Sequence, residues 1–132
     1  MRINTLIGTS IVVGALAAST LTVRAAPGSR KAALFNFLRP TLVAGAIVRG
    51  PTVIVHDDEK MARGEACTTV YRYDRKAPRG EGDEVVSFHC KPTPRPIATK
   101  AQVHTERFTS GFDELLEYQL VGETEGHGVP QR

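Results

Sequence analysis

The sequence contains only two cysteines, no tryptophan, and just five phenylalanines and three tyrosines among its 132 residues. The two cysteines stand 23 positions apart, so no paired-cysteine metal motif occurs, and no heme-attachment motif surrounds them. A glycine-rich phosphate loop and a basic patch with interleaved aromatic residues are also missing from the sequence, which argues against nucleotide and nucleic-acid binding. A core in this chain therefore depends mainly on valine, leucine and isoleucine.

The first 25 residues have the features of a secretory signal peptide. Met1 and Arg2 precede an uncharged, mostly apolar run over residues 3–21, and small residues lead to Ala25. We expect cleavage after Ala25 and an exported protein, periplasmic or extracellular, with no stable membrane insertion afterwards. The alternative is an uncleaved anchor, because the apolar run approaches the roughly 20 residues that a spanning helix needs.

Removal of this segment would leave 107 residues with 15 basic and 14 acidic side chains, a formal charge of +1 instead of +3. The high isoelectric point of the full chain is therefore no argument for a nucleic-acid partner. A chain of this length suffices for one domain with a modest core.

Short apolar segments separated by turn residues dominate the rest of the chain. They predict a mainly β fold, a small antiparallel sandwich or partly open barrel of 5–7 strands with one or two short helical turns. Hairpins are expected around Gly50-Pro51 and around residues 109–114, and Asp57 or Asp58 is expected to cap a helical turn. We divide the chain into a signal peptide (1–25), a leader or short helix (26–40), one β-rich domain (41–124) and a polar C-terminal tail (125–132).

Cys67 and Cys90 stand at the two ends of another predicted hairpin. If residues 67–74 and 83–90 pair with Cys67 opposite Cys90, apolar side chains share one face and mostly polar ones share the other. Directly opposed cysteines are within reach of a disulfide, and exported proteins meet an oxidising compartment. We therefore expect a Cys67–Cys90 disulfide, worth roughly 3 kcal/mol. In this register His89 points away from both sulfurs, so we expect no cysteine nucleophile.

A second hypothesis makes His56, Met61 and His89 the ligands of a metal or redox site. Imidazole and thioether groups suit copper, although the spacing of these residues matches no ligand loop. The acids after His56 lack the alternating donors and the glycine of a calcium loop, and helix capping accounts for them. We expect no catalytic residue and no cofactor, with copper as the alternative.

Three segments resemble a group of small exported bacterial proteins of unassigned function. They read HDDEKMARGEACTTVY, VVSFHCKP and HGVP, beginning at residues 56, 85 and 127. The resemblance covers roughly residues 51–130 and implies one exported bacterial domain, with no activity, cofactor or site residue attached to it.

The leading functional interpretation is a small extracytoplasmic β-rich binding or structural domain, stabilised by one disulfide and without catalysis. A protein or a small ligand is the expected kind of partner. The alternative is a periplasmic copper-type or redox protein that uses His56, Met61 and His89.

Overall fold

The structure, a computed structural model, describes residues 30–108 and 111–131. The predicted signal peptide and the first residues of the predicted leader lie outside this part of the chain. The described strands are β1 (Arg30–Val43), β2 (Ala46–Asp57), β3 (Thr68–Tyr73), β4 (Glu81–Phe88), β5 (Lys91–Pro94), β6 (Gln102–Arg107), β7 (Asp113–Gln119) and β8 (Glu125–Gly128). One short helix, α1 (Asp58–Ala62), follows β2, and a 3-10 turn (Pro78–Gly80) precedes β4.

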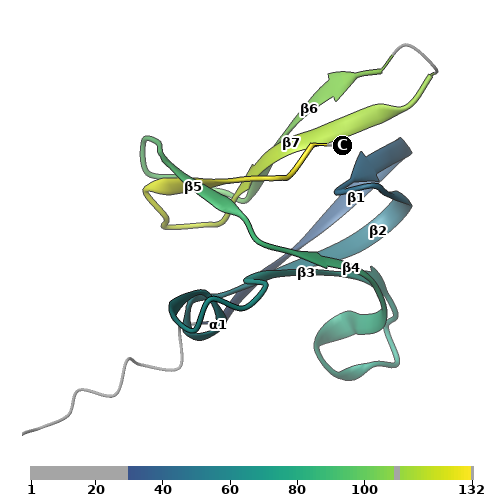
Figure 1. The fold of residues 1–132 in the computed structure, drawn as a ribbon. Coiled ribbons are helices and arrows are strands. Elements are labelled where there is room, and N and C mark those ends of the chain that lie inside the picture. The colour runs from purple at the N-terminus through teal and green to yellow at the C-terminus, as the bar shows by residue number, and fades with distance from the viewer. Residues whose placement is uncertain (1–29, 109–110, 132) are drawn as a thin grey trace, which may run out of the picture.

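The predicted fold class is confirmed, because the strands form one sheet that curves into a half-barrel (Figure 1). There are eight described strands, one more than the upper end of the expected range. The strand order is β4-β3-β2-β1-β7-β8-β5, with β6 on the other edge of β7. No helix among the described residues is long and apolar enough to cross a membrane.

Strand β7 joins two halves of the sheet, the N-terminal half (β1–β4) and the C-terminal half (β5–β8). It pairs with β6 along one edge, while its other edge pairs first with β1 and then with β8. The β1–β7 contact is the single parallel pairing among the described strands and consists of Thr41 with Asp113 and Leu42 with Glu114. The two halves therefore share few backbone hydrogen bonds.

The expected leader or short helix over residues 26–40 is wrong from Arg30 onward, where the chain is already in β1. Phe35 and Phe37 alternate with the exposed Leu34 and Leu38, which is the period-2 pattern of a strand with one buried face. If this stretch were a helix, several of its apolar residues would also share one face, so the sequence pattern fits a helix as well as a strand. Tertiary pairing with β2 decides in favour of the strand.

The hairpin that contains β1 and β2 turns at Ala44 and Gly45, and not at Gly50-Pro51 as expected. Both turn residues have positive φ, 48° and 88°, which is the geometry of a tight two-residue hairpin turn. Pro51 lies inside β2, opposite Asn36. The expected hairpin around residues 109–114 is confirmed by the pairing of β6 with β7.

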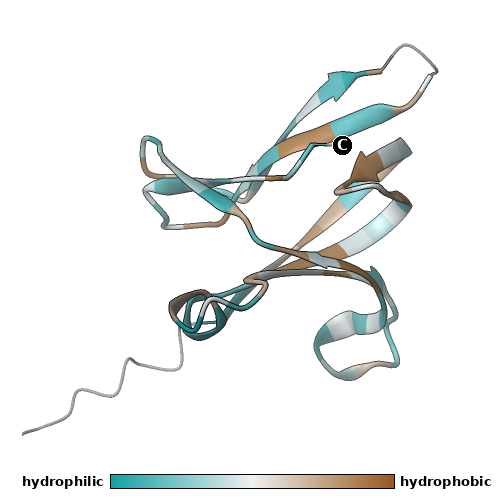
Figure 2. Cartoon of the chain, viewed as in Figure 1, coloured by the Kyte–Doolittle hydropathy of each residue, from teal (hydrophilic) through white to brown (hydrophobic). Residues whose placement is uncertain are grey.

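The core lies on the concave side of the sheet and draws on both halves. Figure 2 shows the strands alternating between hydrophobic and hydrophilic residues along their length. The buried residues of the core are Phe35, Phe37, Val43, Val48, Ile54, Val70, Phe88, Leu115, Tyr118, Leu120 and Val129. Leu115 and Tyr118 come from β7, which explains why this strand can hold the two halves together with little backbone pairing.

The hairpin between the two cysteines has a different register from the expected one. Val70 lies opposite Val86, where the expected register placed Ser87, and irregularities shift the pairing further so that Tyr71 meets Glu84. Thr68 and Val70 therefore face the core, and Tyr73 is exposed. The difference is already present where Thr68 pairs with Phe88, because the cysteines do not stand directly opposite each other, and the irregularities after Val70 shift the later pairs further.

The expected polar tail over residues 125–132 is also wrong for residues 125–128. These residues form β8, which pairs with β5 and β7. His127 is only 2% exposed, and Val129 packs in the core. The segment is polar in composition and was therefore predicted to be a tail, but its pairing with β5 and β7 makes it a strand inside the sheet.

We expect Leu115→Ala to lower the free energy of unfolding by about 2–5 kcal/mol, because it leaves a cavity where β7 joins the halves. Leu38→Ala is the matched control, since the Leu38 side chain is 79% exposed, and it should change stability by at most about 0.5 kcal/mol. Urea unfolding followed by circular dichroism measures both. Equal effects of the two substitutions would contradict the assigned core.

Candidate metal centre

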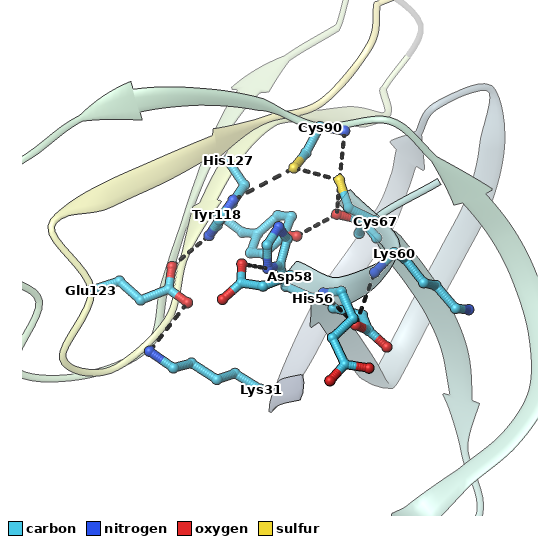
Figure 3. Close-up of polar contacts among 12 residues, drawn as sticks. Lys31, His56, Asp58, Lys60, Cys67, Cys90, Tyr118, Glu123 and His127 are labelled. Carbon is cyan, nitrogen blue, oxygen red and sulfur yellow. Dashed lines mark hydrogen bonds and ion pairs between the residues drawn. The ribbon is translucent and has the colours of Figure 1, made fainter. Parts of the chain in front are cut away.

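Three potential metal ligands from distant parts of the chain meet where the two halves of the sheet face each other. His56, Cys90 and His127 each offer one ligand atom, and these atoms lie within 4.8 Å of one another. We call these three residues the histidine–cysteine cluster. Figure 3 shows His127 between Cys90 on one side and Glu123 on the other.

His56 lies near the end of β2, between its paired neighbours Lys31 on β1 and Thr68 on β3. Its Nδ1 lies 3.3 Å from an Asp58 carboxylate oxygen, while its Nε2 is buried and has no hydrogen-bond partner within residues 30–108 and 111–131. A proton on Nδ1 leaves the lone pair of Nε2 free. An unpartnered buried nitrogen costs about 1–3 kcal/mol, which a bound ligand would offset.

His127 reaches the same point from β8. Its Nε2 contacts a carboxylate oxygen of Glu123 very closely, and its Nδ1 lies 3.6 Å from the Cys90 sulfur. The ring packs on His56, with ring centres 4.1 Å apart, and stacks on Tyr118 at 4.8 Å. Both histidines therefore hold a carboxylate at one ring nitrogen, and His127 turns its other nitrogen toward Cys90, as metal-bound histidines do in proteins.

The environment favours a neutral imidazole at His56. Burial lowers the pKa of His56 below its ordinary value of 6.5, and the nearby His127 lowers it further. A neutral imidazole is the form that binds metal. The ring is also 98% covered by its neighbours, since His56 is 2% exposed.

The expected Cys67–Cys90 disulfide is wrong for this structure. Both residues are free cysteines, and their sulfurs lie 2.8 Å apart, well beyond the roughly 2.05 Å of a disulfide bond. The expected proximity of the two residues is nevertheless present, because both lie just outside the paired parts of β3 and β4. Cys90 occupies the connection between β4 and β5, where the chain passes from one half to the other.

Of the three residues expected to form a metal site, only His56 lies in the cluster. His89 is exposed, as its alternation with the neighbouring Phe88 requires, and Met61 is half-buried on α1. His127 takes the place of the missing histidine. Its motif, HGVP, was visible in the sequence, but its strand and its partners were not.

A surface pocket of about 260 Å³ opens beside the cluster. His127, Asp58, Glu123 and Glu125 line it, together with Lys31, whose ammonium lies 3.8 Å from Glu123. Three carboxylates and one ammonium give the opening an acidic character. Such a surface attracts cations.

The order Cys90, His127, Glu123 also suggests a thiol nucleophile with a histidine base and a carboxylate behind it. The state of the thiol argues against this use. Burial, followed by the hydrogen bond with Cys67, raises the pKa of Cys90 to about 12, whereas catalytic cysteines have lowered pKa values. The arrangement suits metal coordination better, because a bound cation itself displaces the thiol proton.

No protein-family model, no curated protein and no solved structure matches the chain. The resemblance to small exported bacterial proteins therefore stays a prediction.

We expect His56 in the metal-free protein to titrate below pH 6.5, because burial and His127 both oppose its protonation. The unfolded chain then takes up this proton first, so the fold loses stability as the pH falls below 6.5. His127→Gln should raise the pKa of His56 toward its ordinary value. His104→Gln, a change on an exposed side chain of β6, is the control and should leave it unchanged. Histidine ring signals in NMR spectra recorded against pH measure the effect, and a His56 midpoint above 6.5 would contradict it.

Proposed function

We propose that this chain is an exported, non-catalytic metal-binding protein in which His56, Cys90 and His127 hold a first-row transition-metal ion. One observation carries the proposal. A ring nitrogen of His56 lies within 4.8 Å of ligand atoms on Cys90 and His127, and the buried Nε2 of His56 has no hydrogen-bond partner among the described residues. Buried polar atoms in folded proteins nearly always have a hydrogen-bond partner, so a bound ligand would explain why His56 Nε2 is buried here.

The spacing of the cluster supports the same conclusion. Ligand atoms on a tetrahedral ion lie about 3.3–3.8 Å apart, given metal–nitrogen and metal–sulfur bonds of about 2.0–2.3 Å. The 3.6 Å between His127 Nδ1 and the Cys90 sulfur already falls in this range. Imidazole and thiolate together suit zinc and copper and fit calcium or magnesium poorly.

The position of the cluster suggests what a bound ion does for the protein. His56 belongs to the N-terminal half, His127 to the C-terminal half, and Cys90 to the connection between them. A metal ion held by all three residues would crosslink the two halves. Their backbone pairing consists of only two residue pairs, in the parallel contact of β1 with β7. We therefore assign the ion the stabilising role that the sequence suggested for a disulfide.

Export remains part of this proposal and rests on residues 1–25, whose charged start, apolar run and small residues fit a signal peptide. An extracytoplasmic site of this kind would take its metal through the acidic pocket beside His127. A macromolecular partner is not required for this role.

We expect the reduced, metal-free protein to bind one Zn²⁺ per chain. His127→Gln should weaken that binding by about 100-fold or more, because even residues that only hydrogen-bond to a metal ligand contribute 10–100-fold in affinity. Competition with a chromophoric chelator measures the affinity. The matched control, His104→Gln, removes an exposed imidazole and should bind like the wild type. Equal loss in both variants, or no zinc uptake by the wild type, would refute the proposed function.

Glu123→Gln tests the carboxylate that orients His127. We expect zinc affinity to fall 10–100-fold, because the amide supports the imidazole less strongly than a carboxylate does. Glu106→Gln, a change on the exposed face of β6, is the control. If Glu123 serves only the fold, its substitution will lower the stability of the metal-free protein and leave the zinc affinity unchanged.

A further inference from the structure

Cys67 lies against the histidine–cysteine cluster and has no role in the three-ligand site described above. Its sulfur is 2.8 Å from the Cys90 sulfur, and the residue is 3% exposed. The next residue, Thr68, faces the core and hydrogen-bonds to Tyr118, the side chain on which His127 stacks. The sulfur is therefore held at the cluster by contacts with both halves of the sheet.

This sulfur accepts a hydrogen bond from the backbone. The backbone N–H of Cys90 donates a hydrogen bond to Cys67 Sγ at 3.2 Å, and the Thr68 hydroxyl lies 4.0 Å away. Hydrogen bonds from donors to a sulfur stabilise its negative charge and tune sulfur-ligated metal sites. A thiolate next to a second thiolate is unfavourable unless both bind the same cation.

We propose that Cys67 is the fourth ligand, so that the site is a closed arrangement of two cysteines and two histidines, and that its resident ion is zinc. This inference rests on the proposed function and gives that site its metal. Two imidazoles and two thiolates in tetrahedral geometry are a typical structural zinc site, in which four protein ligands leave no position for substrate. The copper expected from the sequence suits a three-ligand, two-histidine one-cysteine site instead.

Charge supports four ligands over three. Two thiolates balance the charge of Zn²⁺ at the ion itself, whereas with one thiolate the balance depends on the carboxylates of Asp58 and Glu123 behind the buried histidines. Burial of an unbalanced charge is costly. Zinc binding requires the sulfurs to separate by about 1 Å, since two thiolates on one zinc ion lie about 3.8 Å apart. Cys67 and Cys90 lie just outside the strands, and a rotation of their side chains can separate the sulfurs while the Cys67 carbonyl keeps its hydrogen bond from the Asp57 N–H.

The sulfur count of the bound ion tests the proposal directly on the reduced wild-type protein. We expect X-ray absorption of the zinc-loaded chain to give two sulfurs near 2.3 Å and two nitrogens near 2.0–2.1 Å, the usual zinc–ligand distances. One sulfur would overturn the role of Cys67 and leave the three-ligand proposal intact. No bound zinc at all would refute the proposed function itself, so the two failures are distinguishable.

Paired serine variants provide a second measurement with Co²⁺ as the probe. If both cysteines are ligands, Cys67→Ser and Cys90→Ser should each reduce the thiolate-to-cobalt charge-transfer absorption per bound ion by about half, and each should weaken binding on the order of 100-fold. A purely structural Cys67 gives the opposite pattern, with full absorption in Cys67→Ser and none in Cys90→Ser.

Discussion

The close contact of His56 with His127 is the constraint on which the arrangement of this protein depends. Strand β7 has only one free edge for two neighbours, so β1 pairs with its beginning and β8 with its end. The remainder of the N-terminal half must diverge from β8. Two imidazoles, packed at a tilt, and a sulfur lie between them instead of backbone pairing. The sheet stays open as a half-barrel.

The sequence allowed the fold class and several local elements to be predicted, because their signals are local. The Asp57 side chain caps α1 by accepting hydrogen bonds from the backbone N–H groups of Glu59 and Lys60, as its position before a short helix suggested. Elements that depend on distant partners were missed. Residues 30–40 carry apolar side chains compatible with helix or strand, and only the pairing with β2 selects the strand. The segment 125–128 is polar and becomes a buried strand between β5 and β7.

The candidate site was half predicted for the same reason. His56 and the approach of Cys67 to Cys90 follow from patterns within about 35 residues of sequence. His127 lies 71 positions beyond His56, and nothing local indicates that the two meet. Met61 and His89 entered the hypothesis because thioether and imidazole groups suit copper, yet His89 is exposed and Met61 lies half-buried on α1. The bonding state of the two sulfurs depends on their separation, which no sequence pattern specifies.

The long separation between His56 and His127 also has a consequence for the order of folding. Hairpins such as β1–β2, β3–β4 and β6–β7 join neighbouring segments and close short loops, whereas the histidine contact closes a loop of 71 residues. Contacts across long loops carry a larger entropic cost and tend to form after local ones. Interactions formed late in folding mainly slow unfolding. An ion held at this contact would thus lengthen the lifetime of the native state while leaving the speed of folding almost unchanged.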